Sequence, residues 1–181
     1  MSGALLAGEC GGRDAMRNLL LNCFLSGCLI LGGCGYTTNA FFLPAHIKTV
    51  YVETFQNKSD QPNLENDLRA KLIETVQNDG NLKIAPEDEA DTVLRGELTG
   101  YTRQALRYLN DEAVQEYRIT VTVNFNFFDR KNNTNIVKAD GFSGDTSYYL
   151  SGSKAKSESA ARSDALDDLA HRILNKVITL W

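Results

Sequence analysis

The sequence has few of the residues that build metal sites, disulfide frameworks or nucleic-acid-binding surfaces. Its 181 residues include two histidines, four cysteines and three prolines, and 23 acidic residues outnumber 19 basic ones. A net charge of −4 argues against a nucleic-acid partner, whose binding surface would be strongly basic. Hydrophobic residues make up 43% of the chain, so we expect a globular core, and the length suits a single domain with an extension.

Long apolar runs are also missing, because none reaches the roughly 18 residues that a membrane-spanning helix needs. The longest, residues 19–31, carries no charge and has the length of a signal-peptide core. Arg17 precedes it, and its end merges into Leu31-Gly32-Gly33-Cys34, a tetrapeptide that resembles the bacterial lipobox. We therefore expect residues 1–33 to be a lipoprotein signal peptide and Cys34 to be the lipid-modified N-terminus of the mature chain.

The predicted cleavage has two consequences. Residues 1–15 include Glu9 and Asp14 and fit neither the basic start nor the apolar core of a signal peptide, so we expect translation to begin at Met16. Removal of the first 33 residues also leaves Cys34 as the one cysteine of the mature chain. Since that thiol is acylated, we expect neither a disulfide nor a thiolate metal site.

The predicted anchor indicates a location. A diacylglyceryl group and an N-acyl chain such as palmitate on Cys34 give three chains, and two already hold a protein stably on a membrane. Gly35 rather than aspartate follows the cysteine, which favours the outer membrane in the enterobacterial sorting rule. We expect residues 34–46 to be a lipidated tether at the periplasmic face of the outer membrane, and we expect no cofactor besides the acyl chains.

Hydrophobic periodicity predicts the elements of residues 47–181, which we take as a single domain. Strands are expected where β-branched and aromatic residues gather or alternate with polar ones, at residues 47–55, 82–84, 92–103, 117–127 and 135–149. Helices are expected where apolar residues recur every third or fourth position, at residues 63–78 and 160–181. This order predicts an α+β fold, a two-layer sandwich with a mixed sheet of four to five strands and two amphipathic helices on one face.

The clearest alternation predicts the two faces of that sheet. From Tyr117 to Phe127 every second residue is apolar, and arginine, threonine or asparagine lies between. One face of the strand is therefore expected in the core. The polar face should lie against water or against the polar lining of a partner.

Strand order also predicts a cluster of cations. The turn at residues 129–134 reverses the chain, so the linking segment 104–115 and the loop 150–157 should lie at the same end of the sheet. Arg107, Lys154 and Lys156 would meet there, beside the apolar side chains of Leu106, Tyr108, Leu109, Tyr148, Tyr149 and Leu150. Such a tip suits a phosphate group attached to an apolar molecule. Simple solvation of loop cations is the alternative.

Short motifs along the mature chain resemble a known family in their order and spacing. These are Cys34-Gly35-Tyr36, Leu43-Pro44 with Ile47-Lys48-Thr49-Val50, residues 55–59, residues 90–98 and Glu116-Tyr117-Arg118-Ile119. The chain resembles the LPS-assembly lipoproteins, the LptE family. The resemblance implies a protein that plugs the polar lumen of the outer-membrane β-barrel LptD, helps the barrel fold and takes part in lipopolysaccharide transport.

The resemblance also implies which residues contact lipopolysaccharide. A basic residue before the second long strand and another before the last helix do so in the family, and these positions fall on Arg107 and Lys154. The segment from Arg107 to Glu116 aligns with a small gap, so the chain departs from the family pattern there.

A second resemblance is to secretion or envelope-complex lipoproteins of the CsgG or TolB N-terminal type, which act as structural assembly modules. It depends on the strand before Phe55, on Asn57-Lys58-Ser59 and on the helix that follows. Co-purification with a large barrel protein, as opposed to a self-assembled ring, would separate the two.

The residues that most often carry catalysis give no pattern here. His171 follows Asp167 by one helical turn, but no activated serine or cysteine accompanies them, and such pairs are usually structural. His46 stands alone near the tether, and the acidic segment 86–91 has no calcium-ligand spacing and suits a solvated turn. We therefore expect neither an enzyme nor a metal site.

Overall fold

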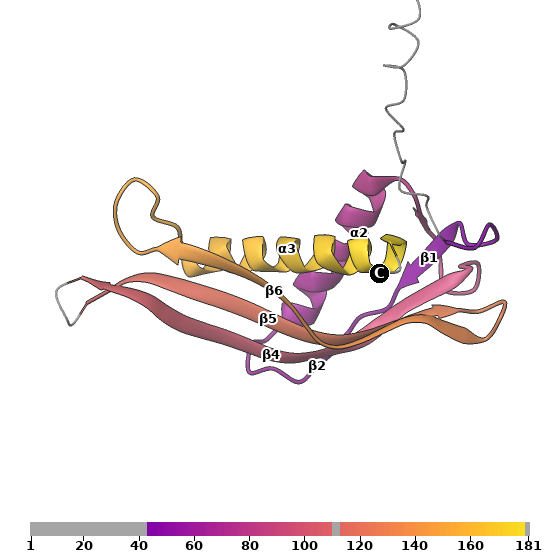
Figure 1. The fold of residues 1–181 in the computed structure, drawn as a ribbon, viewed down its shortest axis with the longest axis horizontal. Coiled ribbons are helices and arrows are strands. Elements are labelled where there is room, and N and C mark those ends of the chain that lie inside the picture. The colour runs from indigo at the N-terminus through magenta and orange to yellow at the C-terminus, as the bar shows by residue number, and fades with distance from the viewer. Residues whose placement is uncertain (1–42, 110–112, 180–181) are drawn as a thin grey trace, which may run out of the picture. The chain divides into compact units, whose positions relative to one another are not determined.

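The computed structural model describes residues 43–109 and 113–179 (Figure 1). The predicted signal peptide, Cys34 and the first part of the predicted tether lie outside these residues. The element order is β1 (Thr49–Val52), β2 (Gln56–Asn57), α2 (Leu64–Asp79), β3 (Lys83–Ile84), β4 (Thr92–Leu109), β5 (Ala113–Asp129), β6 (Thr134–Tyr149) and α3 (Glu158–Thr179). Neither described helix is long and apolar enough to cross a bilayer.

The strands form one mixed sheet in the order β3-β1-β4-β5-β6. β1 runs parallel to β3 and β4, whereas β4, β5 and β6 form an antiparallel meander. The predicted α+β fold with a mixed sheet and two helices is confirmed. A sixth strand, the two-residue β2, pairs in parallel with β4 just after the strand predicted at residues 47–55.

α2 follows the periodicity of its sequence. Leu64, Leu68, Leu72 and Val76 recur every fourth residue and are buried. The helix ends at Gly80, whose φ of 76° lies in the left-handed region and whose N–H donates to the carbonyl of Val76 at 3.2 Å.

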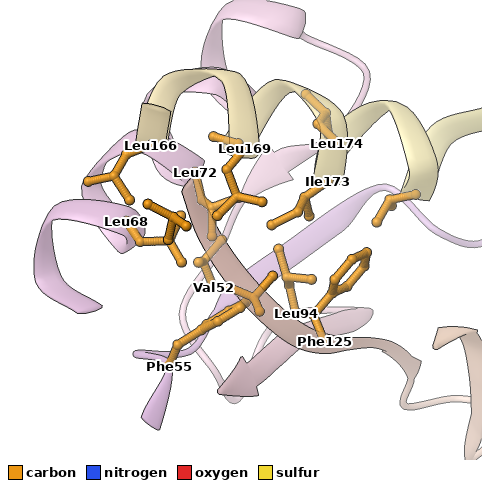
Figure 2. Close-up of a cluster of buried hydrophobic side chains, with 14 of the residues drawn as sticks. Val52, Phe55, Leu68, Leu72, Leu94, Phe125, Leu166, Leu169, Ile173 and Leu174 are labelled. Carbon is orange, nitrogen blue, oxygen red and sulfur yellow. The ribbon is translucent and has the colours of Figure 1, made fainter. Parts of the chain in front are cut away.

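α3 lies over β5 and β6, on the face of the sheet that α2 also covers, and it contacts α2 (Figure 1). Gly144 of β6 permits this approach, because a Cβ atom there would lie 2.5 Å from the backbone nitrogen of Leu169. Figure 2 shows the resulting core, in which Leu169 and Ile173 of α3 meet Leu94 of β4 and Phe125 of β5. The helices therefore bury one face of the meander.

The predicted division of β5 into two faces is confirmed. Ile119, Val121, Val123, Phe125 and Phe127 are all buried, and the threonines and asparagines between them are partly exposed. The sheet face opposite the helices therefore presents polar side chains along β5. We call it the polar face.

Two aspartates fasten the start of the domain to the sheet, and sequence reasoning missed both. Asp129 is 1% exposed and accepts a hydrogen bond from His46 Nε2 at 2.8 Å. Asp91 accepts bonds from the backbone N–H of Lys48 at 2.9 Å and from the N–H and Oγ1 of Thr49 at 3.0 and 2.8 Å. His46 is therefore not isolated, and Asp91 does not belong to a merely solvated turn.

Both carboxyl groups titrate below their ordinary range. The N–H of Lys48 is the main cause of the lowered pKa of Asp91, and burial opposes it. Burial alone would raise the pKa of Asp129, but hydrogen bonds from Asn132 and His46 outweigh it and the pKa is lowered. These hydrogen bonds favour the charged form, so both groups stabilise the fold as carboxylates.

Candidate functional site

The end of the meander that carries the predicted cations is built differently from the prediction. β4 continues through Leu109 and β5 begins at Ala113, so most of the expected linking segment 104–115 is strand. Irregularities in β4 between Ala105 and Arg107 and between Arg107 and Tyr108 break the alternation, which is why the sequence did not predict a strand there. We call residues 104–109, residues 113–118 and the loop 150–157 the distal end.

Arg107 lies on β4 and not in a loop, which corrects the prediction. It pairs in register with Glu116 of β5, and its Nε lies 3.7 Å from Glu116 Oε2. The guanidinium is mostly exposed, whereas the carboxylate is almost buried. Arg107 therefore presents hydrogen-bond donors to solvent while one carboxylate restrains it.

Lys154 lies in the exposed loop after β6, as predicted. Backbone hydrogen bonds hold this loop against the sheet: the N–H of Leu150 donates to the carbonyl of Gln115, and the N–H of Lys156 donates to that of Tyr149, each at 3.0 Å. Lys156 pairs with Asp164 at 2.6 Å. Among the described residues, no acidic side chain forms an ion pair with Lys154.

The register places Arg107 and the loop at the same end of the sheet. Arg107 faces Glu116, and Glu116 faces Tyr149, to which the loop is bonded. Two strand spacings, about 10 Å, therefore separate the backbone of Arg107 from that of Tyr149. The geometry therefore brings the two cations to one end of the sheet.

Every exposed large hydrophobic side chain of the described residues lies at the distal end. The exposed fractions are 39% for Leu106, 58% for Tyr108, 51% for Leu109 and 51% for Leu150. Tyr148, which the sequence placed with them, is instead buried and stacks on Tyr117 with ring centroids 5.9 Å apart. Cations and exposed apolar side chains thus lie at the same end of the sheet, a combination that suits an anionic group attached to an apolar body.

A cluster that sequence reasoning missed holds the start of α3 to β4. Glu158 accepts a hydrogen bond from Tyr101 Oη at 3.2 Å and forms an ion pair with Arg103, whose guanidinium lies 4.7 Å from the ring centre of Tyr117. Burial, with a contribution from Glu158, raises the pKa of Tyr101 to about 12. The cluster fixes one end of the loop that carries Lys154, and no local signal predicts contacts across 55 or 57 residues.

The polar face carries a shallow depression of about 540 Å³. Its lining includes Arg95 and Glu97 of β4, Asn124 of β5 and Lys138 of β6. Glu97 pairs with Lys58 and accepts a 3.0 Å bond from Asn124, and the Lys58 ammonium is the first cause of its lowered pKa. Across the described residues no three histidine, cysteine or acidic side chains group closely enough to hold a metal ion.

Comparison with known proteins gives a family and a fold. The model of the LptE family, described as lipopolysaccharide-assembly, matches residues 47–177. No curated protein sequence matches the chain. The match covers most of the chain and favours the first of the two resemblances over the CsgG or TolB type.

Solved structures share the architecture. A minor lipoprotein from Acinetobacter baumannii is 22% identical with a TM-score of 0.51, and the alignment covers 76% of this chain and 94% of that one. The uncharacterized lipoprotein B from Nitrosomonas europaea is 14% identical with a TM-score of 0.52, over 78% of this chain and 92% of that one. At these identities the likeness is one of fold.

Proposed function

The chain belongs to the LptE family of lipopolysaccharide-assembly proteins, and we propose that it is a lipid-anchored outer-membrane protein that plugs the LptD β-barrel, assists its assembly and takes part in lipopolysaccharide transport. The polar face is the observation that carries this proposal. Both helices cover the opposite face, so β5 is left with threonine and asparagine side chains that no described element covers. The interior of a large outer-membrane barrel is polar and accepts such a surface.

The distal end supports a direct contact with lipopolysaccharide. A phosphorylated glycolipid presents anionic groups beside acyl chains, and Arg107 and Lys154 lie among the exposed Leu106, Tyr108 and Leu150. An arginine binds a phosphate through two parallel donors, and a lysine acts as a point charge. This chemistry is binding and not catalysis.

Co-purification tests the plug. The full chain, tagged at its C-terminus and extracted from outer membranes in detergent, is expected to retain one large barrel protein. A self-assembled ring of this chain without a barrel would contradict the proposal. In the same cells, Cys34→Ser should abolish acylation of the chain and block removal of the signal peptide, and a variant that is still acylated would contradict the predicted anchor.

Charge reversal tests the lipopolysaccharide contact. The double variant Arg107→Glu/Lys154→Glu is expected to weaken lipopolysaccharide binding about tenfold or more, because two charge-assisted contacts become repulsive. Lys138→Glu is the matched control, since Lys138 is an exposed lysine on β6 away from the distal end. Equal binding by the double variant and the control would disprove the site while leaving the family unchanged.

A further inference from the structure

The two long edges of the meander are protected unequally. On β6, the N–H of Asp145 points away from β5 and donates to Asp168 of α3 at 3.1 Å. Farther along, the carbonyl of Tyr149 accepts the N–H of Lys156, and Tyr149 forms a bridge with Ala155. A helix and a loop thus cover two points of the β6 edge. Covering of this kind keeps a free edge from pairing with another chain.

Among residues 43–109 and 113–179, nothing covers the edge of β4 in a comparable way beyond the first half of the strand. β1 pairs with β4 as far as Leu94, and β2 pairs with it at Glu97 and Leu98. In the part of the chain that the structure describes, no strand pairs with this side of β4 from Thr99 to Leu109. Figure 1 shows β4 and β5 continuing past the start of α3 as a projecting hairpin.

This open edge contains one regular stretch. Gly100–Ala105 pairs residue by residue with Thr122–Tyr117, and register shifts lie on either side of it. Bulges discourage edge pairing where they occur, so the run between them is the part that can accept a strand. Its six residues match the commonest length of a strand in globular proteins, about five to six residues.

The register shows which backbone groups are free. The carbonyl of Gln115 accepts the N–H of Leu150 on the β6 side, so odd-numbered residues of β5 direct their backbone groups toward β6. Their partners on β4 are Tyr101, Arg103 and Ala105. In an antiparallel pair, such residues direct both N–H and C=O away from the neighbouring strand. Three donors and three acceptors therefore line the open edge.

We propose that the β4 edge at residues 100–105 binds an extended segment of the barrel partner, which adds a strand to the sheet. The inference rests on the proposed function, since it names where the partner docks. Main-chain hydrogen bonds would give the affinity, as in other cases of strand addition. The segment comes from a loop or terminus of the partner, because the strands of a closed barrel have no free edge.

Charge favours this occupant over a second copy of the chain. The stretch from Thr99 to Leu109 contains Arg103 and Arg107 and no acidic residue. Antiparallel pairing of two copies through the free groups of residues 101, 103 and 105 would place the two Arg103 residues opposite each other, and like charges on paired strands are destabilising even where each arginine also has its own partner, Glu158. A partner segment with carboxylates suits the same edge.

A proline substitution tests the edge. Ala105→Pro removes an N–H that no described residue accepts, so the isolated chain should keep its unfolding midpoint. In co-purification and titration with the detergent-solubilised barrel, this variant should bind about tenfold more weakly or worse, because a ladder bond is lost and the ring obstructs the incoming strand. Ser147→Pro is the matched control, since Ser147 is an exposed residue of β6 whose N–H also points outward.

Amide hydrogen exchange on the unmodified protein tests the same point without a mutation. In the free chain the N–H groups of Tyr101, Arg103 and Ala105 should exchange quickly, and those of Gly100, Thr102 and Gln104 slowly. In the barrel complex the first three should slow by about tenfold or more.

The outcomes separate the two proposals. Suppose that the wild-type chain binds the barrel, that Ala105→Pro binds as tightly as Ser147→Pro, and that amide exchange at residues 100–105 is the same in the complex. Strand addition is then wrong, and the proposed plug function is unaffected. If the wild-type chain does not bind a barrel, both are wrong. If the edge is protected in a dimer of this chain and not in the barrel complex, the occupant is a second copy and the inference is overturned.

Discussion

The half of the meander under the helices and its distal end use the same three strands in different ways. Under α2 and α3, Leu98, Val123 and Phe125 are fully buried. Past the start of α3 the strands continue without a helix, and the apolar side chains of Leu106 and Tyr108 face solvent. The covered half therefore supplies apolar burial, whereas the distal end depends mainly on strand pairing.

The difference separates stability from binding. Three strands without a packed layer are only marginally stable alone, so the distal end depends on the covered half to stay folded. Substitutions at the distal end should therefore change the free energy of unfolding only slightly. The distal end can for this reason carry cations and exposed apolar side chains. Arg107 and Lys154 lie where the core does not constrain the side chains.

The largest contrast should come from truncating one aromatic residue in each half. Phe125→Ala removes a fully buried ring and should lower the free energy of unfolding by about 3–5 kcal/mol. Tyr108→Ala removes an exposed ring and should change it by less than about 0.5 kcal/mol. Urea unfolding of both variants measures the difference. A cost above 2 kcal/mol for Tyr108→Ala would show that the distal end has a packed layer of its own.

A pair of glycines tests the same contrast by adding a methyl group. In Gly144→Ala the new Cβ would lie 2.5 Å from the backbone of Leu169, so α3 must shift and the expected cost is about 1–3 kcal/mol. In Gly100→Ala the nearest atom is Thr122 Cβ at 3.9 Å, an ordinary contact. Thermal unfolding should show a clear drop for the first variant and little change for the second. Equal drops would mean that α3 does not pack as closely on β6 as the structure indicates.

The sequence predicted the covered half of the meander better than the distal end. The faces of β5 and the extent of α2 were predictable because packing imposes a regular period on residues such as Leu68, Leu72 and Phe125. The extension of β4 beyond Arg103 was not. With neither face packed there, no hydrophobic period is required, and the bulges beside Arg107 break whatever alternation remains.

Contacts between distant segments could not be predicted from the sequence either. His46 meets Asp129 across 83 residues, and Asp91 meets Thr49 across 42, so no local pattern marks either pair. The positions of the candidate binding residues were predicted in part. Strand order correctly brought Arg107 and Lys154 to one end of the sheet, but it placed Arg107 in a loop. Their proposed contact with lipopolysaccharide stays a prediction that the charge reversals test.

Acid should weaken the end of the domain opposite the distal end. The folded-state pKa of Asp91 is below its ordinary value of 3.8, so its stabilisation is complete above that value and is lost as the pH falls through the lower, folded-state pKa. At pH 7, Asp91→Asn should cost about 1–3 kcal/mol, since Lys48 and Thr49 lose their charged acceptor. Below about pH 4 the variant should lose less further stability than the wild type.

Asp140→Asn is the control for this titration, because its carboxylate is exposed on β6. Unfolding free energies measured from pH 7 to pH 2.5 should show a flatter acid limb for Asp91→Asn than for Asp140→Asn or the wild type. Parallel curves for all three proteins would mean that Asp91 has the same pKa in the folded and unfolded states.

The smallest expected effect lies at the boundary between the two halves, where Arg103 and Glu158 join β4 to the first turn of α3. Both side chains are nearly half exposed, so water screens the pair and its coupling free energy should be about 0.2–1 kcal/mol. A double-mutant cycle with Arg103→Ala and Glu158→Gln measures it. Because the loop 150–157 leads directly into Glu158, loss of the pair should speed amide exchange in that loop more than in the covered half. A coupling above 2 kcal/mol, or equal changes in exchange in both halves, would show that core and distal end unfold as one unit.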